Sequence, residues 1–227
     1  MLIDACVAAA FFAPRTTRSS HLVNRAASLL RGTSSAFEPQ FLIPSFCIGE
    51  TFAVFEKHRW GASWNRHANA KTRLTPGKFR VARDEFHKAI HNGTKLLQVE
   101  LNRYHVLCLD LIAPINAAYR IKRDRTVKKN VNPASTYDLL VVAMGIWLQR
   151  QHGAEEFLIA TGDERVASVV KRAKSESLGQ PMRNHLSAVA RQIGLTYGPE
   201  IYPRVVDLVH ARKADLEAVL PDWNQEW

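Results

Sequence analysis

The sequence predicts an α/β protein, built as a three-layer α/β/α sandwich with a central, mostly parallel sheet. Short apolar runs rich in Ile, Val and Phe alternate with longer segments that have the helical period. Strands that alternate with helices pair in parallel and are covered by helices on both faces. A chain of 227 residues with 46% hydrophobic residues can bury one core. We therefore expect a single domain over residues 1–227.

The first hundred residues are expected to supply two strands and several helices. Residues 1–7 form a buried strand, and "FLIPSF" a short strand that ends at Pro44. Helices are predicted in "SSHLVNRAASLLRG", where apolar residues share one face and Gly32 provides the stop, and in "SFCIGETFAVFEK". Residues 58–100 show no clean strand, and we expect them to form a basic, mainly helical insertion.

The remaining chain continues the alternation of strands and helices. "YHVLCLD" (104–110) is expected as a third strand, followed by a helix over about 111–125. "NPASTYDLLVVAMGIWLQRQHG" predicts a strongly apolar helix, and "EEFLIATGDERVASVVKRAK" a strand, a tight turn and a helix. "SESLGQPMRN" is expected as a surface loop, "GLTYGPEIYPRVVDL" contains a last strand, and a helix follows near 208–220. Residues 175–227 would be a C-terminal extension.

The net charge and the cysteines indicate which binding partners and which cellular compartment to expect. Thirty-one Lys and Arg against 21 Asp and Glu give a net charge of +10, which favours a polyanion such as nucleic acid. Cys6, Cys47 and Cys108 are odd in number, far apart and embedded in apolar sequence, which indicates reduced thiols in the cytoplasm. The first residues lack the basic region of a signal peptide, and no apolar stretch approaches the roughly 20 residues of a membrane span. We expect no membrane association.

Four acidic residues fall at or near the ends of expected strands. Asp4 interrupts the apolar opening run, Glu50 sits on an apolar helix face after the second strand, Asp138 opens the most apolar helix, and Asp163 follows "FLIAT". The carboxyl ends of parallel strands meet at one edge of a sheet, so the four carboxylates are expected to converge. Like charges that close repel one another unless a cation is present. Ligation by oxygen alone is typical of Mg²⁺ or Mn²⁺.

Each acid except Asp4 also has a structural interpretation. Asp138 could complete a capping box begun by Ser135, and Asp163 could be the N-cap of the helix that follows it. Glu50 could pair with a Lys or Arg. Asp4, inside an expected strand, fits none of these roles. Asp110, at the end of the expected third strand, could join the acidic set but more plausibly caps the next helix.

The ordered motifs "MLIDACVAAAFF", "IPSFCIGETFAVFEK", "STYDLLVVAM" and "FLIATGDERV" resemble the four acidic motifs of PIN-domain nucleases. The resemblance covers roughly residues 1–57 and 104–174. It implies a Mg²⁺- or Mn²⁺-dependent endoribonuclease whose cleavage leaves a 5′-phosphate and a 3′-hydroxyl. Ala5 and Cys6 stand where the family usually has a Thr or Ser, so one hydroxyl contact to the site is expected to be missing.

The resemblance also implies roles for individual residues and partners. Asp4, Asp138 and Asp163 would bind the metal directly, and Glu50 would bind it through water or act as a base. Thr161 matches the hydroxyl residue two positions before the last acid and is placed with the substrate-binding residues. Many members are toxins of toxin-antitoxin pairs, so a small antitoxin protein and a homodimer are the protein partners expected.

A substrate such as RNA requires basic and stacking surfaces. The segment "YRIKRDRTVKK" supplies the candidates for the phosphate backbone, namely Arg120, Lys122, Arg123, Arg125, Lys128 and Lys129. A run of this kind is as often only a solvated face. Trp60 and Trp64 could stack bases but more often would be core or lid residues. His87 and His91 have the spacing of a zinc pair without an evident third ligand.

Two other functions share these features. A non-catalytic module with the same fold could bind RNA or a protein through its basic segments. A structure-specific DNA nuclease would use the same metal chemistry and could be separated from a ribonuclease only by its substrates.

Overall fold

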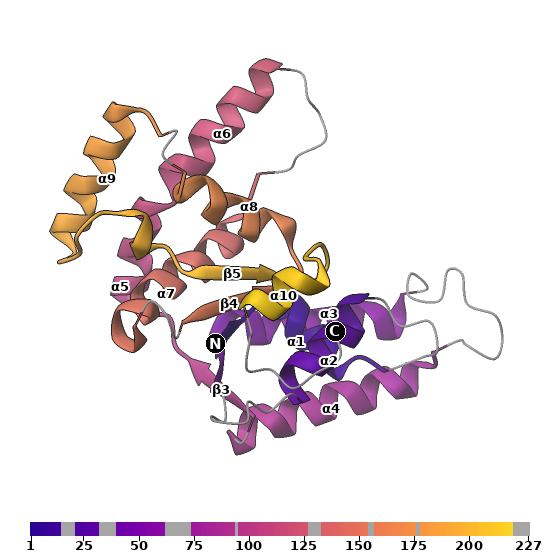
Figure 1. Ribbon diagram of the computed structural model, residues 1–227. Helices are drawn as coiled ribbons and strands as arrows, with labels where there is room; N and C mark the ends of the chain where they lie inside the picture. The colour runs from indigo at the N-terminus through magenta and orange to yellow at the C-terminus, as the bar shows by residue number, and fades with distance from the viewer. Residues whose placement is uncertain are drawn as a thin grey trace. The chain divides into compact units, whose positions relative to one another are not determined.

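The predicted fold class is confirmed by a computed structural model, which describes residues 1–14, 21–31, 40–61, 74–93, 95–126, 133–153, 157–175 and 178–219, with the backbone alone described at 122–126 and 219. Five parallel strands form one sheet in the order β3-β2-β1-β4-β5, flanked by helices in a three-layer α/β/α arrangement (Figure 1). The strands are β1 (Leu2–Ile3), β2 (Phe41–Pro44), β3 (Leu96–Val99), β4 (Leu158–Thr161) and β5 (Arg204–Asp207).

The chain divides into two compact units. Unit 1 comprises Met1–Glu100, Ala160–Gly162 and Asp207–Trp227, and unit 2 comprises Leu101–Ile159 and Asp163–Val206. The boundary therefore runs through β4 and β5. Each unit is described separately below.

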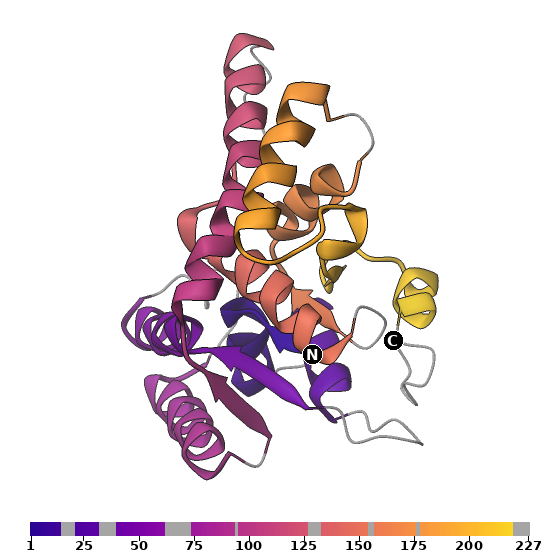
Figure 2. The same ribbon diagram turned by 90° about the vertical axis from the view of Figure 1, so that its left-hand side faces the viewer.

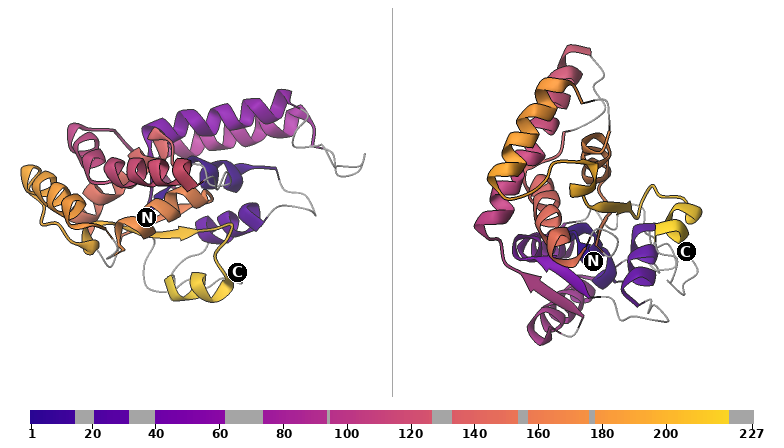
Figure 3. Two further views of the ribbon diagram at one scale, coloured as in Figure 1. Left: turned by 90° about the horizontal axis from the view of Figure 1, so that it is seen from above. Right: turned by 60° about the vertical axis from the view of Figure 1, so that its left-hand side comes forward.

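In unit 1, parallel strands carry the helices that position the first two acids. Leu2 of β1 pairs with Leu42 of β2, and β2 pairs with β3 from Phe41↔Leu96 onward; β2 and β3 appear as adjacent arrows in Figure 2. The helices are α1 (Ala5–Phe12), α2 (His21–Arg31), α3 (Ser45–Trp60), α4 (Pro76–Asn92) and α10 (Lys213–Val219). Helix α1 packs on α2 and α3, and α3 lies along α4 (Figure 3).

Aromatic side chains fill the space between these helices. Phe86 of α4 makes edge-to-face contacts with Phe12 and Phe52, with ring centroids 5.3 and 5.1 Å apart. Phe55 of α3 lies 6.0 Å from the same ring and is buried. Offset and edge-to-face aromatic pairs add to the stabilisation that burial itself provides. Helices α1, α3 and α4 are therefore held as one layer above the strands.

The expected strand over residues 1–7 is wrong beyond Ile3. Strand β1 is only two residues long, and α1 begins at Ala5. The three alanines Ala8–Ala10 favour a helix, and Asp4 provides an N-cap. The apolar run is continuous because strand and helix are both buried, which hides the boundary between them.

Unit 2 is organised around α7 (Thr136–His152), whose middle turns are buried on nearly all sides. Around it are α5 (Arg103–Leu107), the 3₁₀ helices η2 (Cys108–Leu111) and η3 (Pro199–Ile201), α6 (Ala113–Thr126), α8 (Glu164–Ala173) and α9 (Gln180–Gln192). A Cβ added at Gly145 of α7 would lie 2.6 Å from Ile159 and 3.0 Å from Pro203, so this helix approaches its neighbours closely. The buried Tyr202 hydroxyl donates to the Leu111 carbonyl at 2.9 Å.

The expected strand at 104–110 is also wrong, because this segment forms α5 and η2. Asn102 and His105 form a capping box that starts the helix, and Asp110 lies exposed within η2 rather than at a strand end. The third strand is Leu96–Val99, inside the segment expected to lack one. As an edge strand it exposes Leu97 and Gln98, so it carries no continuous apolar signal.

The other elements confirm the pattern with small shifts of their ends. Strands β2, β4 and β5 and helices α2, α3, α6, α7, α8 and α10 occur where the alternation predicts them. The expected loop "SESLGQPMRN" is wrong in its second half, because α9 begins at Gln180 with Pro181 in its first turn. Within the described ranges, none of the helices combines the length and the apolar character that crossing a membrane requires.

Candidate metal centre

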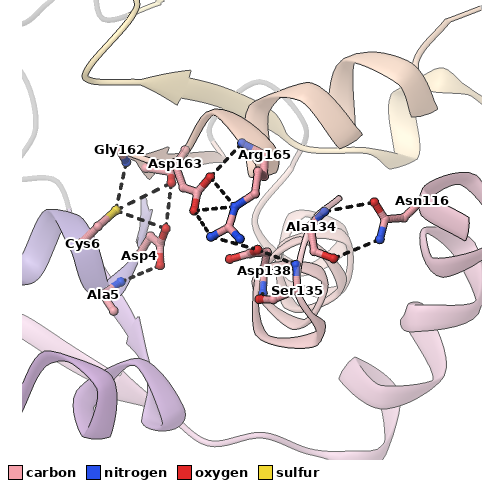
Figure 4. A network of polar contacts seen from close by, with 11 residues as sticks. Asp4, Ala5, Cys6, Asn116, Ala134, Ser135, Asp138, Gly162, Asp163 and Arg165 are labelled. Atoms are coloured by element: carbon pink, nitrogen blue, oxygen red, sulfur yellow. Dashed lines mark hydrogen bonds and ion pairs between the residues drawn. The ribbon is translucent and has the colours of Figure 1, made fainter. Parts of the chain in front are cut away.

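Asp4 follows β1 directly and is the N-cap of α1. Its Oδ1 accepts a hydrogen bond from the Ala5 backbone N–H at 2.7 Å (Figure 4). Its Oδ2 accepts a hydrogen bond from the Thr161 hydroxyl at 2.7 Å. The side chain is buried, with 8% of the residue exposed. The inference that Asp4 has no capping role was therefore wrong, since it depended on a strand over residues 1–7, whereas β1 ends at Ile3.

Cys6 supplies the contact that the motif comparison expected to be missing. Its Sγ donates to Asp4 Oδ2 at 3.3 Å and accepts the Gly162 backbone N–H at 3.0 Å. Burial, followed by the negative charge of Asp4, raises the pKa of the Cys6 thiol well above its usual value. The thiol is thus protonated at neutral pH and acts as the donor that a hydroxyl would otherwise be.

Thr161, at the end of β4, is fully buried and directs its hydroxyl to Asp4. A role in contacting substrate was the expectation for this residue. The geometry shows a different contact, in which Thr161 orients the Asp4 carboxylate within unit 1.

Asp4, Cys47 and Glu50 form the candidate metal cluster of unit 1. One ligand atom from each side chain lies within 4.8 Å of the other two. Cys47 and Glu50 are three residues apart on α3, so they share one helix face, and Cys47 is buried whereas Glu50 is accessible. Glu50 lies in the second turn of α3 and has no capping role. Cys47 was expected only as a reduced thiol and not as a ligand, although its spacing from Glu50 was the available signal.

The donor types of this cluster fit a divalent cation. Two carboxylates suit Mg²⁺ or Mn²⁺, while a thiolate such as that of Cys47 would suit softer ions such as Zn²⁺. The carboxylates come from two elements and are like charges in a partly buried position, which a cation would stabilise. The carboxylate oxygens of Asp4 and Glu50 are donors that a hard cation prefers, and Cys47 adds a softer donor to the same cluster.

Asp138 and Asp163 form the second acidic pair, within unit 2, and both cap helices. Asp138 completes a capping box with Ser135, whose backbone N–H donates to Asp138 Oδ2 at 2.6 Å. Asp163 is the N-cap of α8 and accepts the Arg165 backbone N–H at 2.8 Å. The structural interpretations that the sequence left open for these two acids are thus realised.

Arg165 bridges the two carboxylates (Figure 4). Its Nε lies 2.9 and 3.0 Å from the two oxygens of Asp163, to which Nη2 also donates, and Nη2 lies 3.5 Å from Asp138 Oδ2. The Arg165 guanidinium therefore occupies the position between these two carboxylates that a metal ion could take. Sequence analysis missed Arg165; its place two residues after a candidate acid, in the first helical turn, was the only signal.

The loop before α7 is fixed by a buried amide. The Asn116 side chain donates to the Ala134 carbonyl at 3.1 Å and accepts the Ala134 N–H at 3.2 Å (Figure 4). Ala134 precedes the N-cap Ser135, so this pair positions the first turn of α7 and with it Asp138.

The protonation of Asp163 reflects two opposing effects. Burial acts to raise the pKa of this carboxyl, but hydrogen bonds from the Arg165 side chain and backbone outweigh it and hold the pKa below the ordinary value of 3.8. Asp163 is therefore ionised at neutral pH and available as an anionic ligand if Arg165 moves away.

The predicted substrate-binding residues are only partly described. Arg120 lies exposed on α6. The last turns of α6 contain Lys122, Arg123 and Arg125, whose side chains are not described. Outside the described residues lie Lys128, Lys129 and Trp64.

The Trp60 side chain is 74% exposed, and its indole N–H donates to Glu56 at 2.9 Å, with the Arg59 guanidinium over the ring. His87 and His91 stack on α4, and in the described part of the chain no third ligand joins them.

Comparisons with known protein families, with curated proteins and with solved structures found no match to this chain.

Proposed function

We propose that the protein is a metal-dependent endoribonuclease of the PIN type, which hydrolyses RNA phosphodiester bonds with Mg²⁺ or Mn²⁺. The observation that carries the proposal is the cluster of unit 1, in which the buried Asp4 and the accessible Glu50 bring carboxylate oxygens within 4.8 Å of each other.

In this proposal a bound divalent ion would lower the pKa of a water and stabilise the charge that develops around phosphorus. Asp4 and Glu50 of unit 1 would hold the ion, and Asp4 is kept in one orientation by Thr161, Cys6 and the Ala5 backbone. Glu50, the more accessible of the two, would orient a water or accept its proton. The PIN resemblance also assigns Asp138 and Asp163 to metal binding. Arg165 neutralises Asp138 and Asp163 when no ion is bound.

The biological setting is part of the same proposal. A toxin of a toxin-antitoxin pair would have a small antitoxin protein as its partner and could act as a homodimer. The cytoplasm is the proposed compartment, which is supported by the free thiols of Cys6, Cys47 and Cys108.

A second candidate is the non-catalytic module that binds RNA or a protein. The contacts of unit 2 favour it, because both acids there cap helices and already pair with Arg165. Such a protein would retain the fold and bind its partner without a metal.

The test is cleavage of labelled single-stranded RNA by the purified protein with Mg²⁺, with Mn²⁺ and with EDTA, beside the Asp4→Asn variant. Asn preserves the N-cap of α1 while removing the charge. Metal-dependent cleavage by the native protein alone supports the nuclease. Cleavage whose products carry end groups other than a 5′-phosphate and a 3′-hydroxyl contradicts it. Parallel reactions with single-stranded and branched DNA separate the ribonuclease from a DNA nuclease.

RNA that is bound but left intact under every metal condition, equally by the native protein and by Asp4→Asn, supports the binding module instead. Circular dichroism of both proteins establishes that the variant is folded. The Glu85→Gln variant, which removes an exposed carboxylate from α4, is the control for the loss of one negative charge.

A further inference from the structure

Two aromatic rings of unit 2 form a flat stack. Tyr104 of α5 and Trp147 of α7 have ring centroids 4.4 Å apart and an interplanar angle of 2°. Helices α5 and α7 are packed against each other, and both rings are only partly buried. A parallel pair of large rings at the surface is an arrangement on which a further planar group can stack.

An arginine lies close to each ring of this stack. The Arg103 guanidinium lies 4.7 Å from the Tyr104 ring centroid, and the Arg150 guanidinium lies 5.1 Å from that of Trp147. Both arginines are exposed. Guanidinium planes accept stacked bases as aromatic rings do, and they also pair with phosphate.

The stack borders a hollow of about 580 Å³ between α5, α7 and the end of α9. Tyr104, Trp147 and Arg150 line it together with the amide side chains of Gln151 and Gln192, and none of its lining residues is acidic. This volume is in the range of small-molecule sites, which are typically a few hundred Å³ or more. Amide groups can donate to and accept from the polar edge of a base.

Arg150 is held loosely. Its Nη1 reaches the Ile193 carbonyl, at the C-terminal end of α9, at the long distance of 3.5 Å. A bond of that length is weak, so if the guanidinium turned toward a phosphate it would give up only this bond and its contact with the Trp147 ring.

From these contacts we propose that the Tyr104–Trp147 hollow binds an unpaired nucleobase, which stacks on the ring pair while Arg150 or Arg103 holds its phosphate. An acidic peptide would satisfy the arginines but would make no use of two parallel rings. The base could belong to single-stranded RNA or to a free nucleotide. RNA as the source rests on the proposed function, whereas base binding itself requires neither the acids nor a metal.

The experiment measures binding of a short, fluorescently labelled oligo-uridylate by anisotropy in EDTA, so that cleavage cannot interfere. Tyr104→Leu and Arg150→Gln are expected to weaken binding about tenfold each, as removal of one stacking or phosphate contact does. Tyr104→Phe keeps the ring and should bind as the native protein. Arg80→Gln, which removes an exposed arginine from α4, is the matched control for the loss of one positive charge.

A second readout identifies the site directly. Irradiation of the complex with RNA that contains 5-bromouridine should cross-link Tyr104 or Trp147, which peptide mass spectrometry would detect. Competition by uridine monophosphate at the same site assigns the free nucleotide as a ligand, and competition only by the oligonucleotide assigns the RNA strand.

Three results would overturn the proposal. The Arg80→Gln control could weaken binding as much as Tyr104→Leu and Arg150→Gln do, which would show binding by overall charge. Oligo-glutamate could compete as well as RNA. Cross-links could map only outside the hollow while Tyr104→Leu, shown to be folded by circular dichroism, binds normally. Because the assay omits metal, each result is independent of whether the acidic residues catalyse cleavage.

Discussion

The Thr161 hydroxyl donates a 2.7 Å hydrogen bond to Asp4 Oδ2 from a position 157 residues away in the sequence. Both residues are buried, Asp4 after β1 and Thr161 at the end of β4. Strands β1 and β4 are neighbours in the sheet, so the bond joins the ends of two adjacent strands. A buried carboxylate is tolerated only when donors replace its water.

Replacing Thr161 with Val should destabilise the protein, because Val keeps the shape and removes the donor to a buried charge. We expect the free energy of unfolding to fall by about 1–3 kcal/mol, the usual consequence of leaving one buried polar partner unsatisfied. Urea denaturation followed by circular dichroism measures it. Thr161→Ser, which retains the hydroxyl, should lose less; equal losses in both variants would show that the methyl group matters rather than the hydrogen bond.

The Asp163 carboxyl should make stability depend on pH in the acid range. Its pKa in the folded state lies below the ordinary 3.8, so its contribution is fully present above that value and is lost as the pH falls through the folded pKa. Asp163→Asn keeps an N-cap for α8 but cannot titrate. Melting temperatures between neutral and strongly acid pH should therefore fall less steeply in the variant, and superimposable curves would refute this role.

Arg165 should compete with metal for the second acidic pair. Because its guanidinium bridges Asp138 and Asp163, an ion bound there must displace it. Arg165→Gln is expected to increase affinity for Mn²⁺ several-fold, while it removes the salt bridges that stabilise the apo protein. Calorimetric titration measures the affinity, with Lys171→Gln on the same helix as the control for one lost positive charge. Weaker metal binding in Arg165→Gln would contradict the competition.

The thiols should resist alkylation in the folded protein. Burial raises the pKa of the Cys6 thiol well above its usual value, with a further contribution from Asp4, and burial raises that of Cys108 to about 12. Cys47 is fully buried. Only thiolates react readily with iodoacetamide, so mass spectrometry should detect little labelling at neutral pH and complete labelling in denaturant. Rapid labelling of Cys6 in the native protein would show that its contact with Asp4 is wrong.

The sequence predicted the fold class well because most elements carry a periodic apolar signal. Helix α7 is apolar on nearly all sides, and β2 and β4 are buried along their whole length. The apolar pattern did not predict the element where burial of the side chains does not follow the period of a helix or a strand. Strand β1 continues into a buried helix without a polar break, and the edge strand β3 is half exposed.

The candidate site was predictable in part for a similar reason. Parallel strands bring their carboxyl ends to one edge, and this rule led to Asp4 and Glu50, which lie together with Cys47. The role of Arg165 could not be predicted, because which cation faces a helix-capping carboxylate depends on side-chain direction. Likewise, the thiol of Cys6 replaces an expected hydroxyl through a contact that residue type alone does not indicate.

The central claim, that Asp4 and Glu50 bind a divalent ion, is tested most directly by calorimetric titration of the apo protein with Mn²⁺. Native protein and Glu85→Gln should bind the ion alike, whereas Asp4→Asn and Glu50→Gln should lose about tenfold or more in affinity, as the loss of a carboxylate ligand predicts. If the native protein does not bind Mn²⁺, or if all four proteins bind it equally, the cluster is not a metal site and the nuclease proposal fails.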